Sequence, residues 1–254
     1  MAGYPDEVKK IFADWKQSQL CADLEACADE LQKRRLEFIE YGEPDKLTPK
    51  KRAALNSKLL AQALLHRSDC LIQAAGKMLI AKNVYGLALV ARGHVEATSV
   101  LGHFCRRIDS FSKGNIEFDR YEQDIANGLL GAKDDLFTQA KAPVSILTCI
   151  ENTDKYLNAE LFDGEKKDMM EEIYIWLSEF AHPNFCSNKS AFNLDRETNR
   201  MIFRHDADLQ ESDFGLAGYM AVSAGFFPSL YDRFEKACEA TLAEDVPAAP
   251  PCPA

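Results

Sequence analysis

The sequence predicts an all-α fold, a helical bundle of about seven to eight helices with one small β-hairpin insertion. Apolar residues recur at helical spacing along most of the 254-residue chain, and proline, glycine and N-cap residues divide them into segments. The alternation typical of strands is confined to residues 191–205. We therefore expect a single domain over residues 1–243, in which residues 1–41 could form a separately packed N-terminal arm, followed by a disordered tail over residues 244–254.

The first segment has a clear helical pattern. Pro5 and Asp6 form a helix start, and apolar residues follow at i, i+3, i+4 and i+7 from Val8 to Trp15. The apolar stripe continues towards Ile39, so the segment is one long helix or two helices in line.

The next helices are separated by clear breaks. Gly42 to Asp45 ends the first segment, and Thr48 followed by Pro49 supplies an N-cap and a proline at the first helical position. From Pro49 to about Phe111 the pattern is helical, and we expect two helices divided near residues 82–86. Further helices are expected over about residues 116–130, 143–161, 165–181 and 213–242.

Two segments depart from the helical pattern. Residues 191–194 and 201–204 are short, partly alternating runs joined by polar residues, which predicts the β-hairpin. Residues 244–254 contain four prolines and three alanines, a composition typical of a disordered tail.

Composition and charge exclude several classes of protein. The chain is 46% hydrophobic, which is ordinary for a globular protein, and its formal net charge is −10. A negative chain is a poor match for a surface that coats phosphate backbones, so RNA is not favoured as a partner. The eight cysteines contain no C-x-x-C pair, which excludes zinc ribbons and favours a reducing, cytoplasmic location.

One uncharged stretch, residues 214–231, requires a membrane test. Its eighteen residues would span about 27 Å as a helix, just short of a bilayer core of roughly 30 Å. Several glycines, serines and a proline dilute its apolar content, so we expect a buried central helix and no membrane association. Ala217, Ala221 and Gly225 form a stripe of small residues on which another helix could pack closely, and that helix could belong to a second subunit.

The sequence lacks the usual motifs of nucleotide, hydrolase and metalloprotease sites, so we expect no cofactor. His66 and Asp69 share a helical face, but such a pair is far commoner on a solvated surface than in a metal site. We expect no metal.

A polar stripe marks the helix expected over residues 87–111. Arg92, Glu96, Ser99 and His103 recur at i, i+4, i+7 and i+11 and so share one face, opposite an apolar face. The stripe is either a solvated surface with an Arg92–Glu96 ion pair or the wall of a groove or partner interface, in which Glu96 could position Arg92 or His103.

The second polar feature is the segment from Leu177 to Asn184. Pro183 disfavours the helical conformation at His182, so this imidazole is expected at the end of its helix beside the last unpaired carbonyl groups. Ser178, Glu179 and His182 lie on a helix with a wide apolar face, which we expect to be enclosed. They are therefore either a structural hydrogen-bond cluster or part of a functional pocket.

Together, these two features resemble those of a known group of helical proteins. A helix with Arg92 and Glu96, followed by the Leu-Ser-Glu-Phe-x-His-Pro segment at residues 177–183, resembles a loose group of uncharacterised bacterial helical proteins that are distantly similar to HEPN-type bundles. The resemblance implies a helical, often dimeric protein, in a group that includes toxin and abortive-infection ribonucleases. HEPN nucleases carry an arginine, a polar residue and then a histidine on one helix. Here the Arg-x4-His pair, Arg200 and His205, has Met201 after the arginine and lies in the predicted hairpin.

We therefore predict a HEPN-like cytoplasmic protein that acts mainly by binding, as a homodimer or with a protein partner. The alternative is a metal-independent RNA nuclease of the toxin or phage-defence type. In that alternative His182 is the general acid or base, Arg92 or Arg204 stabilises the developing charge on phosphate, and Glu96 or Glu179 orients the pair.

Overall fold

The structure is a computed structural model of the chain. It describes residues 3–40, 42–43, 47–132, 141–162, 165–183, 185–203 and 208–243. These ranges form nine α-helices, one short 3-10 helix and one two-stranded antiparallel sheet, which confirms the predicted all-α bundle with one hairpin.

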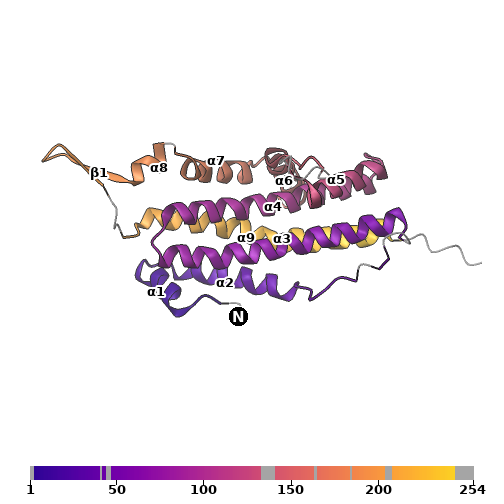
Figure 1. Cartoon of the computed structure of the whole chain (residues 1–254), viewed down its shortest axis with the longest axis horizontal. Coiled ribbons are helices and arrows are strands. Elements are labelled where there is room, and N and C mark those ends of the chain that lie inside the picture. The colour runs from indigo at the N-terminus through magenta and orange to yellow at the C-terminus, as the bar shows by residue number, and fades with distance from the viewer. Residues whose placement is uncertain are drawn as a thin grey trace, which may run out of the picture.

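Three long helices form the centre of the bundle and run side by side along its long axis (Figure 1). They are α3 (Pro49–Ile80), α4 (Val84–Ser112) and α9 (Phe214–Leu242). Helix α4 packs against α3 and α9 on one side and against α6 and α7 on the other. It is therefore the element that connects the two halves of the bundle.

The starts of α3 and α4 follow from their N-cap residues. The Oγ1 atom of Thr48 accepts a hydrogen bond from the backbone N–H of Lys51 at 3.3 Å, and Pro49 occupies the first helical position. The Oδ1 atom of Asn83 accepts one from the N–H of Gly86 at 2.8 Å. The two helices thus divide at residues 81–83, next to the predicted boundary.

The N-terminal segment forms two helices, α1 (Asp6–Asp14) and α2 (Ser18–Lys33). Lys16 between them has a φ of +58°, a left-handed conformation that changes the direction of the chain. Helix α1 packs on α3 and α2 on both α3 and α9, and the hydroxyl of Tyr4 donates to the carbonyl of Ile72 at 2.8 Å. The buried side chains of this segment belong to the same core as those of the long helices.

The opposite side of the bundle carries four shorter helices. They are α5 (Phe118–Leu130), α6 (Ile146–Glu160), α7 (Met169–Ala181) and α8 (Phe185–Ser190). The six-residue α8 was not expected, and it raises the number of helices above the predicted seven to eight. Helix α7 is also less enclosed than expected, since Ile175 and Trp176 on it are exposed.

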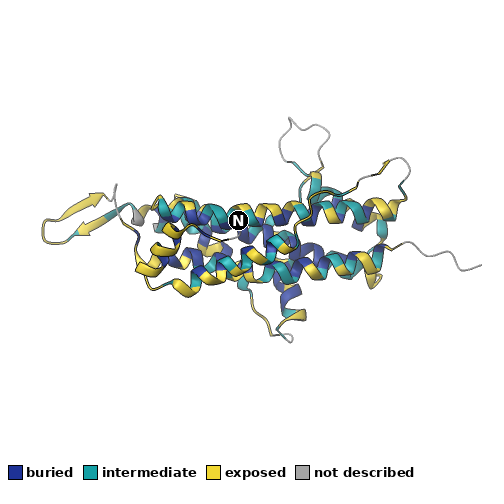
Figure 2. Ribbon diagram, turned by 90° about the horizontal axis from the view of Figure 1, so that it is seen from below, coloured by how far each residue is buried: buried dark blue, intermediate teal, exposed yellow. Residues whose placement is uncertain are grey.

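The hairpin consists of β1 (Phe192–Asp195) and β2 (Arg200–Phe203), with Phe192 opposite Phe203. Figure 2 shows that it projects from one end of the bundle and is largely exposed. Its apolar residues Leu194, Met201, Ile202 and Phe203 are each more than half exposed. The hairpin therefore forms an exposed apolar surface at this end of the bundle.

A polar cluster lies inside the core between α3, α4 and α9. The two ring nitrogens of His94 lie 2.6 Å from the Ser68 hydroxyl and 2.7 Å from the Ser223 hydroxyl. All three side chains are fully buried. Burial lowers the pKa of His94 to about 3, so the imidazole is neutral in the folded protein.

No helix in the described part of the chain is long and apolar enough to cross a membrane, and this holds for α9, which contains the uncharged stretch 214–231. The predicted tail at residues 244–254 lies outside the described residues, as do Arg204 and His205.

Candidate functional site

The structure brings Arg92, Glu96 and His182 together, although 90 residues separate the arginine from the histidine. The Nη1 atom of Arg92 lies 3.3 Å from Nε2 of His182, and its Nε donates to Glu96 at 3.1 Å. Its Nη2 donates to the hydroxyl of Tyr174 at 2.8 Å, and its guanidinium carbon lies 4.8 Å from the centre of the Tyr174 ring. Every nitrogen of the guanidinium is therefore engaged by a neighbour within the chain.

The position of His182 follows from the proline after it. His182 ends α7 with extended backbone angles, φ −102° and ψ 155°, as predicted for a residue before proline. Its backbone N–H donates to the carbonyl of Ser178 at 3.0 Å, which closes the last turn of α7. The exposed side chain extends from this end to the arginine on α4.

The contact with Arg92 defines how the imidazole can act. A guanidinium only donates hydrogen bonds, so Nε2 of His182 must be the acceptor, and the ring proton is then on Nδ1. In this arrangement the lone pair of Nε2 is occupied, and His182 presents an N–H donor to its surroundings. A general base would need that lone pair for the substrate.

The other two residues of the polar stripe on α4, Ser99 and His103, are not solvated. The interpretation of the stripe as a solvated surface is therefore wrong for half of its four residues. Ser99 and His103 are buried because α6 packs over them. The Thr153 hydroxyl donates to the carbonyl of Ser99 at 2.7 Å, and Nδ1 of His103 lies 2.8 Å from the side-chain amide of Asn152. Arg92 and Glu96 keep 20% and 28% of their side-chain surface exposed, at the edge of this contact.

A groove runs between α6 and α7 and includes His182. Its volume is about 1120 Å³, and on α7 it extends from Asp168 to His182, a distance of about 21 Å at 1.5 Å per residue. Apolar side chains contribute to its lining, among them Leu147 and Ile175, which are 63% and 56% exposed. The groove is therefore long and partly apolar.

The groove carries more negative than positive side chains. Its carboxylates are those of Glu151, Asp154, Asp168, Glu171 and Glu179. Its lysines are Lys155, which pairs with Glu151, and Lys166, which lies 3.2 Å from Asp168. Five carboxylates thus face two lysines, and both of these lysines are already paired with groove carboxylates.

Asp154 is the buried carboxylate of the groove. It accepts hydrogen bonds from the backbone N–H groups of Met170 at 2.9 Å and Glu171 at 3.0 Å, so a residue of α6 caps the N-terminus of α7. Burial, together with the nearby charges of Asp168 and Glu171, raises the pKa of Asp154 to about 6 against the opposing effect of the two N–H donors. Asp154 therefore links α6 to α7 and also adds a negative charge to the groove.

Glu179 lies in the groove wall close to His182, on the same face of α7. The hydroxyl of its neighbour Ser178 donates to the carbonyl of Tyr174 at 2.7 Å. The predicted cluster is thus a groove wall with His182 at its end.

Sequence reasoning missed Tyr174 and Asp154. Tyr174 had a detectable signal, because it lies two helical turns before His182 on the same face of α7. Asp154 had none, since its role depends on how α6 approaches α7 in three dimensions.

The other described candidates, His66, Asp69 and Arg200, do not line this groove. Among the residues that the structure describes, no group of three or more His, Cys, Asp or Glu side chains could hold a metal ion. Nε2 of His66 lies 3.6 Å from the sulfur of Cys70, and Asp69 accepts from Gln32. Arg200 lies on the hairpin.

Comparison of the chain with protein-family models, with curated proteins and with solved structures found no significant match. The HEPN-like relationship therefore stays a prediction.

Proposed function

We propose that this chain is a binding protein and that the groove between α6 and α7 holds a basic, partly apolar segment of a partner protein. The observation that carries this proposal is the excess of carboxylates in the groove, five against two paired lysines. Charge complementarity of this kind selects cationic partners and opposes a polyanion such as RNA.

The shape of the groove supports an elongated partner. A length of about 21 Å matches a helix of roughly 14 residues and exceeds what a compact metabolite needs. The exposed Leu147 and Ile175 would contact the apolar face of such a helix, while the carboxylates pair with its basic side chains. The projecting apolar hairpin supports the same proposal, because exposed apolar surface commonly marks protein interfaces.

The state of His182 also supports binding over turnover. Its Nε2 lone pair is occupied by Arg92, so the imidazole can donate a hydrogen bond to a partner but does not present a base. The neighbouring hydrogen bonds to Tyr174 and Glu96 hold the arginine in this position.

Fluorescence anisotropy tests the proposal with a labelled amphipathic peptide of leucine and lysine and a matched peptide of leucine and glutamate. We expect the lysine peptide alone to bind, and Glu171→Lys to weaken it about tenfold, equivalent to about 1.4 kcal/mol. Glu172→Lys is the control, because Glu172 is an exposed neighbour that does not line the groove. Equal effects of the two substitutions, or binding of the glutamate peptide, would contradict the proposal.

The second candidate is a metal-independent ribonuclease, which the 3.3 Å separation of Arg92 and His182 favours, because such an enzyme needs a histidine and a cationic donor close together. Total RNA would be incubated with the protein and with His182→Ala in the presence of EDTA. Cleavage by the wild-type protein and not by the variant would establish this function and overturn binding as the main role.

A homodimer in a reducing compartment completes the proposal. The seven cysteines in the described part of the chain are free, which supports the cytoplasm. In the predicted stripe of small residues on α9, Ala217 is buried within the chain, Ala221 is partly buried and Gly225 is exposed. Gly225, together with Gly215 and Gly218, leaves open space where a Cβ atom would meet no neighbour within 4 Å, so a second subunit could approach this part of α9 closely. Sedimentation at two concentrations tests the dimer, and a mass near 28.5 kDa at both would contradict it.

A further inference from the structure

The seam between α3 and α9 is covered by α2 over only part of its length (Figure 1). At the end of α2, Arg34 pairs with Asp232 of α9 at 2.6 Å, and its backbone carbonyl accepts from Gln62 of α3 at 2.9 Å. Beyond these contacts, towards the start of α3 and the end of α9, the seam opens into a cleft that shares no lining residue with the α6/α7 groove.

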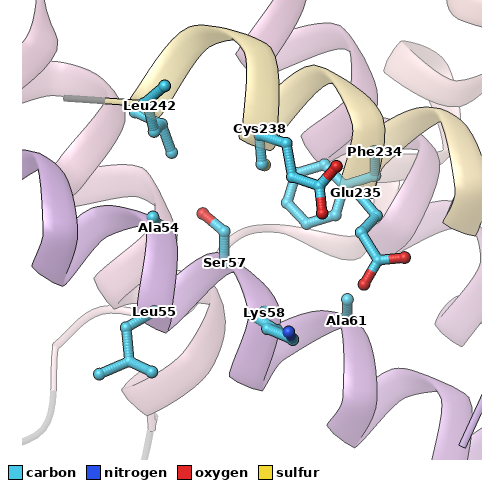
Figure 3. Close-up of a pocket in the computed structure, with 11 residues that line it drawn as sticks. Ala54, Leu55, Ser57, Lys58, Ala61, Phe234, Glu235, Cys238 and Leu242 are labelled. Carbon is cyan, nitrogen blue, oxygen red and sulfur yellow. The ribbon is translucent and has the colours of Figure 1, made fainter. Parts of the chain in front are cut away.

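The cleft exists because the facing side chains of α3 are small. Ala54, Ser57 and Ala61 lie opposite Phe234, Cys238 and Leu242 of α9 (Figure 3). The cleft has a volume of about 370 Å³, within the range of ligand pockets, whereas protein cores seldom leave voids larger than a water molecule. Phe234, Cys238 and Leu242 are themselves buried, so the lining on the α9 side lies below the molecular surface. Because the volume is about a third of the 1120 Å³ of the α6/α7 groove, the cleft suits a single alkyl chain better than a helix.

The floor of the cleft is polar but uncharged. The Ser57 hydroxyl donates to the carbonyl of Ala53 at 2.8 Å and lies 3.0 Å from the hydroxyl of Tyr121, which in turn lies 3.5 Å from the sulfur of Cys238. Burial raises the pKa of Cys238 to about 11, so the sulfur is a neutral thiol. Because these polar groups hydrogen-bond to one another, they need no polar partner from a ligand. The deep end of the cleft can therefore hold an apolar group.

Charged side chains lie only at the rim. Glu235 and Glu239 contribute two carboxylates from α9, and Lys58 contributes one ammonium group from α3. Lys58 and Glu239 are exposed, and Glu235 is partly buried. The rim is therefore net negative, which favours a cationic head group over an anionic one.

We propose that this cleft binds a single-chain cationic amphiphile, with its alkyl chain between α3 and α9 and its ammonium group at Glu235 and Glu239. The site is separate from the groove of the proposed function, and neither depends on the other. The small residues of α3 admit the chain, and the two rim carboxylates select the charge of the head.

Isothermal titration calorimetry tests the proposal with dodecylamine and dodecanoate, which share a chain length and carry opposite charges at neutral pH. Both are used below the concentrations at which they form micelles. We expect dodecylamine to bind one-to-one and about tenfold or more tighter than dodecanoate. Ala54→Leu should weaken dodecylamine about tenfold by filling the cleft, whereas Ala240→Leu, at an exposed position of α9 that does not line it, should not.

Two further variants identify the site and the origin of the selectivity. The double substitution Glu235→Gln and Glu239→Gln should remove most of the preference for dodecylamine without altering the cleft. Glu171→Lys in the groove should leave binding unchanged. Absence of saturable binding, equal or tighter binding of dodecanoate, or binding that survives Ala54→Leu and is lost with Glu171→Lys would each overturn the proposal.

Discussion

The buried imidazole of His94 predicts a defined loss of stability in acid. Its pKa is about 3 in the folded protein and about 6.5 in an unfolded chain. Above pH 6.5 the histidine is neutral in both states, whereas below it the unfolded state binds a proton that the folded state rejects. The contribution of His94 is therefore present at neutral pH and is lost as the pH falls below 6.5.

The size of this loss follows from the pKa difference. Each pH unit below 6.5 costs about 1.36 kcal/mol, so at pH 4.5 the two units amount to about 2.7 kcal/mol. A His94→Gln variant does not titrate at this position and serves as the reference. At neutral pH the variant should be less stable by about 1–3 kcal/mol, because the hydroxyls of Ser68 and Ser223 lose part of their hydrogen bonding.

Urea unfolding followed by far-UV circular dichroism at several pH values from 7 to 4.5 measures the difference between the two proteins. The stability advantage of the wild type should shrink by about 2.7 kcal/mol over this range. Contributions from other groups, such as the buried His103 and Asp154, are common to both proteins and cancel in the difference. A difference that stays constant with pH would refute the reasoning, because His94 would then be protonated equally in both states.

Three further substitutions test other contacts. Arg92→Lys removes the planar group that joins three neighbours and should lower the free energy of unfolding by about 1–2 kcal/mol in urea titrations; an unchanged value would mean that these bonds add no stability. Burial raises the pKa of Asp154 from 3.8 to about 6, so between these pH values the folded state keeps a proton that the unfolded state has released. The stability of the wild type should therefore fall relative to Asp154→Asn as the pH rises from about 4 to 6. The opposite slope in unfolding experiments would exclude a raised pKa of Asp154. Gly102→Ala should destabilise the protein by about 1–3 kcal/mol, since the new Cβ would lie 2.5 Å from the Thr153 side chain. Gly93→Ala, whose new Cβ would have its nearest neighbour at 3.6 Å, should stabilise it by up to about 1 kcal/mol. If thermal unfolding gave both substitutions the same sign, the packing of α4 on α6 would be contradicted.

Local signals in the sequence predicted most of the fold. Thr48 and Pro49 mark the start of α3, and Pro183 places His182 at the end of α7, because N-caps and prolines act on their immediate neighbours. The hairpin was predicted from its alternating runs, and the structure gives its register. These features depend on chain chemistry within a few residues, which a sequence displays directly.

The failures concern contacts between distant segments. The stripe on α4 was open to two interpretations, and Ser99 and His103 are buried only because α6, some fifty residues later, packs on that face. The helix wheel gives the face but not what covers it. The cap that Asp154 forms on α7 could not be predicted for the same reason. The cleft could not be predicted either, because it forms where small side chains of α3 face α9.

The contact between Arg92 and His182 could be predicted from the sequence only in part. Each residue stands out on its own helix, the arginine through its polar stripe and the histidine through its position before proline. Their separation could not be derived from the sequence, and the structure gives it as 3.3 Å. The Arg92–Glu96 ion pair was predicted from the spacing of the two residues, whereas the hydrogen bond from Arg92 to Tyr174 depends on how α7 packs against α4.

Hydrogen exchange measured by mass spectrometry, with and without the leucine and lysine peptide, tests most directly whether the α6/α7 groove is the binding site. Exchange should slow in α6 (Ile146–Glu160) and α7 (Met169–Ala181) and stay unchanged in α1 to α3, because only the groove walls would be covered. Protection of another face, or no protection of α6 and α7 at a concentration where anisotropy shows the peptide bound, would contradict binding in the groove.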